Sequence, residues 1–166
     1  WSPDALNVRK VSEASPSRHP SGLPWKTHAM NADSFKTIEL TPSQSEAAER
    51  AINSVLAGEP LFRIGGYAGS GKSTLAHVIL DEVPGAAVCA FTGKAASVLR
   101  RKGLPQAATI HSTIYRYDPA RDEFVLKARE ELEGVRYFLI DEASMIAQQQ
   151  WDDLCSFCKP IVAVGD

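Results

Sequence analysis

The stretch GYAGSGKST, Gly66–Thr74, decides how this chain folds. It fits the pattern G-x-x-x-x-G-K-[ST] and stands between an apolar run, Leu61–Gly65, and a helical pattern, Lys72–Glu82. In that context the glycines let the backbone curl so that successive N–H groups point inward at phosphate oxygens, and the following helix adds its N-terminal partial positive charge. We therefore predict a phosphate-binding loop, in which Lys72 reaches the terminal phosphates of a nucleotide and the Ser73 hydroxyl binds Mg²⁺. The alternative is a glycine-rich turn that matches the pattern by chance.

Short apolar stretches alternate with helical patterns along much of the chain. Each apolar stretch is nearly continuous, as in a strand that is covered on both faces, and the alternation is typical of an α/β domain with a parallel sheet. Ligands bind such a sheet at the carboxyl ends of its strands, so the loops that follow the strands are the expected sites. The expected strands are Leu61–Gly65, Ala87–Phe91, Val135–Ile140 and Ile161–Gly165, and the expected helices are Lys72–Glu82, Ala95–Lys102 and Ile146–Phe157.

A further helix is predicted to begin directly after Thr41. Thr41 is a suitable N-cap, Pro42 suits the first helical position, and Gln44 can complete a capping box; Gly58 is expected to end the helix. Residues 38–166 are therefore expected to form one domain. Residues 1–37 are rich in Ser, Pro, Asn and His without a sustained period, and we expect them to form a mobile arm.

Composition sets broad limits on function. The chain has 166 residues, of which 44% are hydrophobic and 23% charged, as in an ordinary globular domain. Its 18 Lys and Arg against 20 Asp and Glu give a formal net charge of −2, so any contact with nucleic acid must be local. Three cysteines and no apolar run of membrane-spanning length predict a cytoplasmic protein. Two of them, Cys155 and Cys158, are expected to pack on one helix face rather than to bind metal.

Two consecutive acids follow the third expected strand, in the stretch FLIDEASM, Phe138–Met145. An unpaired buried charge is costly, so two acids at the end of an apolar strand indicate a function. Beside a phosphate loop, Asp141 would bind the hydration shell of Mg²⁺ and Glu142 would orient and deprotonate the attacking water. The alternative is that Asp141 caps the next helix and that Glu142 is solvated.

Several segments also follow one another in a characteristic order. LTPSQ (Leu40–Gln44) is similar to an adenine-reading Q motif, GYAGSGKST to Walker A, AFTGKAASVLRRKG (Ala90–Gly103) to motif Ia, TIHS (Thr109–Ser112) to the next DNA-contacting segment, IDEASM (Ile140–Met145) to motif II and AVGD (Ala163–Asp166) to the start of motif III. From about Leu40 onward the chain thus resembles the first RecA-like domain of superfamily 1 DNA helicases, in the RecD-like group. Walker motifs alone occur in many ATPases, whereas the ordered set is specific.

The resemblance implies a three-layer P-loop NTPase domain of the α/β class with a parallel sheet. Strand Ile161–Gly165 would lie between Leu61–Gly65 and Val135–Ile140, and Ala87–Phe91 would be outermost beside the latter. ATP and Mg²⁺ are the implied cofactors, and single-stranded DNA and a second RecA-like domain are the implied partners. Since the sequence stops inside motif III, we expect a domain that is incomplete at its C-terminus, poorly active alone, and open at the sheet edge beside Leu61–Gly65.

The expected site residues fall into groups by role. Lys72 and Glu142 are the expected catalytic residues, and Ser73 and Asp141 the expected Mg²⁺ residues. The resemblance implies that Gln44 pairs with the adenine edge. The expected nucleotide-binding residues are Gln44, Gly66, Ala68, Gly69, Ser70, Gly71, Lys72, Ser73, Thr74 and Asp141, and the expected DNA-binding residues are Thr92, Gly93, Lys94, His111 and Ser112.

Three of these residues have plainer alternatives. Gln44 already has a local role in its capping box. Lys94 is compatible with a solvated lysine on an ordinary capped helix, and His111 with a structural histidine.

Two other functions fit the same motifs. A P-loop kinase would transfer phosphate to a nucleotide or small-molecule acceptor, and a non-catalytic module would bind nucleotide or DNA without turnover. Hydrolysis of ATP with and without single-stranded DNA separates these functions from that of a helicase motor.

Overall fold

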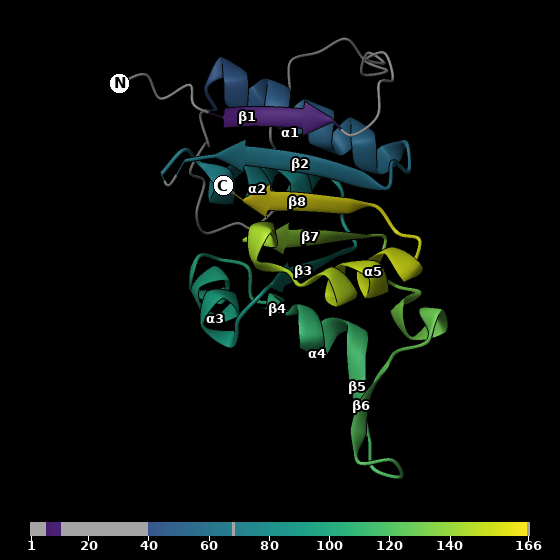
Figure 1. The fold of residues 1–166 in the computed structure, drawn as a ribbon. Helices are drawn as coiled ribbons and strands as arrows, with labels where there is room; N and C mark the ends of the chain where they lie inside the picture. Colours follow the sequence, from purple (N-terminus) through teal and green to yellow (C-terminus); the bar gives the residue numbers. More distant parts are fainter. Residues whose placement is uncertain (1–5, 11–39, 68, 166) are drawn as a thin grey trace.

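The computed structural model describes residues 6–10, 40–67 and 69–165, and its main feature is a twisted sheet of six strands. Five of the strands run parallel, and the edge strand β1 is antiparallel to its neighbour (Figure 1). Across the sheet the order is β1 (Leu6–Lys10), β2 (Leu61–Gly66), β8 (Ile161–Gly165), β7 (Tyr137–Asp141), β3 (Ala86–Ala90) and β4 (Ala108–Thr109).

Helices cover both faces of this sheet and bury two hydrophobic clusters. Successive residues of a strand point to opposite faces, and β7 shows it: Tyr137 and Leu139 belong to one cluster, Phe138 and Ile140 to the other. The first cluster packs against α1 (Pro42–Leu56), α2 (Lys72–Glu82) and α3 (Gly93–Arg101), and the second against α4 (Ile110–Ile114) and α5 (Gln148–Ser156). The three-layer α/β class predicted from the sequence is therefore confirmed.

The order predicted for four of the strands is also confirmed, with one difference at β3. Strand β8 lies between β2 and β7, and β3 lies on the other side of β7. Strand β3 is not outermost, because the two-residue strand β4 pairs with its free edge. The helix expected over 146–157 is shorter than predicted: a 3₁₀ turn, η2 (Ala143–Met145), comes first and α5 begins only at Gln148.

The sheet edge beside β2 is occupied, contrary to the expected open edge. Strand β1 pairs antiparallel along β2, from Leu6 opposite Gly66 to Lys10 opposite Phe62. An unpaired strand edge presents a row of N–H and C=O groups, which a short extended segment can satisfy wherever it comes from in the chain. The mobile arm expected over 1–37 is therefore corrected for these five residues, and its other residues lie outside the described part.

A two-stranded hairpin projects from the main sheet and was not predicted. It consists of β5 (Tyr115–Asp118) and β6 (Glu123–Leu126), paired from Tyr115 opposite Leu126 to Asp118 opposite Glu123 (Figure 1). A 3₁₀ turn, η1 (Arg129–Leu132), returns the chain toward β7. An isolated hairpin is marginally stable in water, so its root must be held by the rest of the domain. Within the described residues, no helix is long and apolar enough to cross a membrane.

Candidate functional site

The predicted phosphate loop connects β2 to α2. Gly69 and Gly71 both have positive φ, +81° and +88°, values that L side chains rarely adopt. The Ser70 N–H donates to Tyr67 O at 3.1 Å, and the Leu75 N–H donates to Gly71 O at 3.0 Å, where the helix begins. Ala68 lies outside the described residues. The curled loop therefore ends at a helix N-terminus, the arrangement that binds phosphate in proteins.

Gln44 contacts this loop from the first turn of α1. Its Oε1 accepts from the Thr41 N–H at 3.0 Å, which completes the predicted capping box. Its Nε2 donates to Ser70 O at 3.0 Å. A Cβ at Gly71 would overlap Gln44 Nε2, so Gly71 is required both for its positive φ and for this close approach. Gln44 thus fixes the position of the loop, a role that the sequence did not reveal.

The polar groups of the loop suit an anionic ligand. Lys72 Nζ donates to Gly66 O and, at 3.2 Å, to Tyr67 O, so the ammonium lies against the loop backbone. The Ser73 hydroxyl accepts from Lys102 Nζ at 3.1 Å. Ser70 Oγ is buried without a hydrogen-bond partner in the described part, and a buried hydroxyl of this kind is costly unless a ligand satisfies it. A nucleotide phosphate with Mg²⁺ therefore fits the residues present.

The two acids stand at the carboxyl end of β7. Asp141 pairs with Val164 of β8, and Gly65 of β2 pairs with Gly165 on the other side of β8. Two strand spacings, about 10 Å, therefore separate the backbone of the acids from the entrance of the phosphate loop. Glu142 adopts a left-handed conformation, φ 56° and ψ 42°, which is uncommon for a residue with a side chain. Glu142 is the N-cap residue of η2 and Ala147 that of α5, so Asp141 occupies neither N-cap position, whereas Glu142 is exposed, as the alternative expected.

The expected DNA-binding residues lie at the starts of two helices that follow β3 and β4. Thr92 caps α3, its side chain accepting from the Ala95 N–H at 3.1 Å, and Gly93 and Lys94 are exposed beside it. Thr109 caps the one-turn helix α4 in the same way, accepting from the Ser112 N–H at 3.1 Å. Both helices begin at the same edge of the sheet as the phosphate loop, since β2, β3 and β4, which lead into these three elements, belong to the parallel part of the sheet.

His111 is exposed and lies against the aromatic side chains of the hairpin. Its ring is 4.8 Å from that of Tyr115 and 4.6 Å from that of Phe124, centroid to centroid. Phe124 is 60% exposed and Tyr117 50%, and their rings are 5.6 Å apart. Sequence reasoning missed this aromatic surface. The signal that would have found it is the alternation in Tyr115–Asp118 and the aromatic and β-branched residues of Glu123–Leu126, on either side of a turn that begins at Pro119.

The root of the hairpin also contacts α5. The Tyr115 hydroxyl donates to Asp153 Oδ2. Partial burial and the Asp153 carboxylate raise the pKa of Tyr115 to about 12, so the phenol stays protonated and remains a donor.

The cysteines carry no recognisable site. Cys155 and Cys158 are exposed, so the expectation that they pack is wrong: α5 ends at Ser156, and its buried residue here is Leu154. Burial raises the pKa of Cys89 to about 11, and slight desolvation of the thiol together with the nearby Asp152 carboxylate raises the pKa of Cys155, which disfavours the thiolates that bind metals. The described residues contain no group of three His, Cys, Asp or Glu that could hold a metal ion.

Strand order, the glycine loop at the end of β2 and the acid pair at the end of β7 together define a P-loop NTPase domain of the α/β class. The family model described as the AAA domain matches residues 39–166, and the chain belongs to this family.

Similar proteins are known among helicases. The chain is 27% identical over 139 residues to the ATP-dependent DNA helicase dda of Enterobacteria phage T4, a match that covers 77% of this chain and 32% of that protein. The crystal structure of Pif1 helicase from Candida albicans matches with a TM-score of 0.53 and 27% identity, over 78% of this chain and 33% of that one. Bacteroides Pif1 bound to ssDNA matches in fold, with a TM-score of 0.56 and 21% identity, over 78% and 32% of the two chains. The chain therefore spans about a third of the length of these relatives.

Proposed function

We propose that this chain is the ATP-binding and ATP-hydrolysing motor domain of a DNA helicase, which couples hydrolysis to movement along single-stranded DNA and to unwinding. The observation that carries the proposal is the placement of the glycine loop and the Asp141–Glu142 pair on either side of β8, at one edge of the sheet. The relative in phage T4 is an ATP-dependent DNA helicase, and the Bacteroides Pif1 structure contains ssDNA, which supports the same function here.

In this proposal the loop residues Gly66–Thr74 bind the phosphates of ATP. Lys72 has a flexible four-carbon stem, so its ammonium can leave the carbonyls of Gly66 and Tyr67 and pair with the terminal phosphate oxygens. Ser73 and Asp141 would hold Mg²⁺, which neutralises charge on the phosphates when it is bound. Gln44 would present the second hydrogen of Nε2 and the second lone pair of Oε1 to the adenine edge, while its bonds to Ser70 and Thr41 keep α1 against the loop.

Glu142 is the proposed general base. Its left-handed backbone costs conformational energy, and strain of this kind persists where the surrounding structure holds it, often at functional sites. The carboxylate is exposed at the mouth of the site, so it can accept a proton from a water that approaches the terminal phosphate. Phosphoryl transfer depends mainly on positioning and charge neutralisation, so a second RecA-like domain that closes over this face would raise the rate.

Single-stranded DNA would follow the exposed starts of α3 and α4 and continue onto the hairpin. The capped helix starts offer backbone N–H groups to phosphates, Lys94 adds a positive charge, and His111 with Ser112 lies next in line. Tyr117 and Phe124 expose aromatic rings on which bases can stack. A net charge of −2 is compatible with such a local contact. The proposed location is the cytoplasm, a reducing compartment in which the three free thiols would stay reduced.

The test is a measurement of ATP hydrolysis with and without oligothymidine. Stimulation of hydrolysis by the DNA is the expected result. Transfer of phosphate to an added nucleoside or small-molecule acceptor would instead assign a kinase. Binding of ATP without turnover, in the presence of DNA and of a second domain supplied from a relative, would leave a binding module and refute the motor function.

A further inference from the structure

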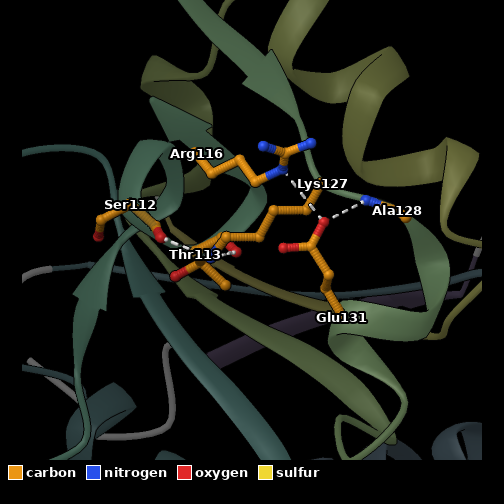
Figure 2. Close-up of polar contacts among 6 residues, drawn as sticks. All are labelled: Ser112, Thr113, Arg116, Lys127, Ala128 and Glu131. Carbon is orange, nitrogen blue, oxygen red and sulfur yellow. Dashed lines mark hydrogen bonds and ion pairs between the residues drawn. The ribbon is translucent and has the colours of Figure 1, made fainter. Parts of the chain in front are cut away.

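The helix α4 is held at its C-terminal end by a residue from the far side of the hairpin. Lys127 follows β6 directly, and its Nζ donates to Ser112 O at 3.0 Å and to Thr113 O at 2.8 Å (Figure 2). The backbone N–H of Lys127 donates to Ile114 O at 2.8 Å. One residue therefore supplies hydrogen bonds to three successive carbonyl groups at the end of α4.

These bonds matter because α4 is a helix of five residues. The last four carbonyl groups of any helix lack partners within it, and in a helix this short they are almost all of the carbonyl groups present. A single turn is also below the length at which a helix is stable by itself. A cation at the negative end of the helix is favourable, so the Lys127 ammonium satisfies the carbonyls and compensates the helix dipole together.

A second set of contacts joins the two strands of the hairpin where they leave the rest of the domain, beside Lys127. Glu131 Oε1 accepts from the Ala128 N–H at 2.9 Å and lies 3.4 Å from Nε of Arg116 on β5 (Figure 2). The carboxylate thus joins the outgoing strand to the residue directly after Lys127. The Arg116 and Glu131 side chains are half-exposed, so this ion pair contributes little stability alone, and Lys127 is the more strongly held member of the root.

We propose that Lys127 is a positioning residue of the single-stranded DNA site: it locks α4 to the hairpin, so that His111 and the exposed hairpin aromatics form one surface. This inference rests on the proposed function for its DNA part. Lys127 acts through α4 in this proposal, since both of its side-chain bonds go to backbone carbonyls of that helix. Without the two Lys127 bonds, α4 and the hairpin adopt many orientations relative to each other, and only a fraction of these bind DNA.

The experiment compares Lys127→Met, which keeps the length of the side chain but removes the charge, with Lys127→Arg, which keeps donors for the two carbonyls. Lys159→Met, outside the hairpin and its root, controls for the loss of one positive charge. Affinity for fluorescein-labelled oligothymidine is measured by anisotropy over a salt series, and amide hydrogen exchange is measured without DNA.

If the competent orientation falls to about a tenth of the Lys127→Met molecules, the apparent affinity falls about tenfold. The slope of log affinity against log salt stays unchanged, whereas loss of a phosphate contact would reduce it by about 0.7. Lys127→Arg restores affinity, Lys159→Met leaves it unchanged, and ADP affinity is equal in all variants. Without DNA, amides over 110–128 exchange faster in Lys127→Met alone, while those of β7 and β8 do not.

The outcomes separate the inference from the function it rests on. Failure of the parent chain to bind oligothymidine refutes the proposed DNA site. The exchange measurement then tests only whether Lys127 holds α4 to the hairpin. Unchanged exchange over 110–128 in Lys127→Met refutes the proposal that Lys127 holds α4 to the hairpin. Normal exchange with a reduced salt slope would make Lys127 a phosphate contact instead, which also overturns the proposal.

Discussion

Replacement of Gln44 by Ala tests how the phosphate loop is held in place. The Gln44 side chain makes two hydrogen bonds, from the Thr41 N–H to Oε1 and from Nε2 to Ser70 O, both 3.0 Å long. The Thr41 hydroxyl still accepts from the backbone N–H of residue 44 in the variant, so the N-cap itself survives. The substitution therefore removes the Gln44 half of the capping box together with the link between α1 and the loop, and it leaves the Thr41 cap in place.

The expected effect on stability is modest and can be worked from these bonds. Each hydrogen bond contributes about 0.5–1.5 kcal/mol, and Ala gains about 0.4 kcal/mol in helix propensity. The free energy of unfolding should thus fall by roughly 0.5–2.5 kcal/mol. In a domain of this size, a fall of that magnitude lowers Tm by about 2–8 °C.

Gln44→Glu distinguishes the two bonds. Its carboxylate still accepts from Thr41 N–H but can no longer donate to Ser70 O, which it repels, so it should recover less than half of the Tm loss and bind ADP at least as weakly as Gln44→Ala. Thermal unfolding by circular dichroism and calorimetric titration with ADP give the two quantities. Equal ADP affinity in Gln44→Glu and the parent chain would show that the contact with Ser70 does not position the loop. An unchanged Tm in Gln44→Ala would show that these two hydrogen bonds do not contribute to the free energy of unfolding.

Four further substitutions test the other proposed roles. Lys72→Ala should abolish ATP binding or weaken it strongly in calorimetry, because it removes the loop cation that reaches the terminal phosphates; equal affinity would refute the phosphate-loop function. Glu142→Gln should keep ATP–Mg²⁺ binding and lose steady-state turnover in a chain with its second domain, and substantial residual kcat would place the base elsewhere. Lys94→Ala should reduce the salt slope of oligothymidine binding by about 0.7 without changing ATP affinity, and an unchanged slope would move the DNA path away from α3. Tyr137→Phe should lower the free energy of unfolding in urea by about 1–2 kcal/mol, because the buried hydroxyl donates to Val83 O at 2.9 Å at the end of α2.

The central part of the fold could be predicted because its signals are local. Runs of buried residues such as Ile161–Gly165 read as strands covered on both faces, and the boundaries of α2 agree with the prediction at both ends. The strand order came from the resemblance to the helicase family rather than from any pattern, since crossovers leave no mark in composition. Strand β1 was not predicted: Leu6–Lys10 alternates apolar and polar residues, but so short a run does not by itself indicate a strand or reveal the distant edge with which it pairs.

The candidate site likewise has residues that local patterns predict and contacts that they do not. The loop residues and the acid pair were visible because phosphate binding requires particular residue types at fixed spacing. The contact of Gln44 with Ser70 and the reach of Lys127 to α4 join residues 26 and about 15 positions apart, which no local pattern encodes. His111 was expected near DNA, but its packing between Tyr115 and Phe124 depends on a hairpin register that only the folded chain defines.

The strand order places the two proposed sites on one edge of the sheet without overlap. Strands β2 and β7, which lead into the phosphate loop and the acids, flank β8, whereas β3 and β4, which lead into the proposed DNA contacts, lie beyond β7. Asp141 therefore stands at the boundary, with the phosphate loop on one side and the start of α3 on the other. The element that continues from the acids, η2 followed by α5, reaches the hairpin root through Asp153 and the Tyr115 hydroxyl. A displacement of the acids on hydrolysis would thus be felt at both ends of the proposed DNA path, since Ala90, which leads into α3, pairs with Asp141, and α5 contacts the hairpin.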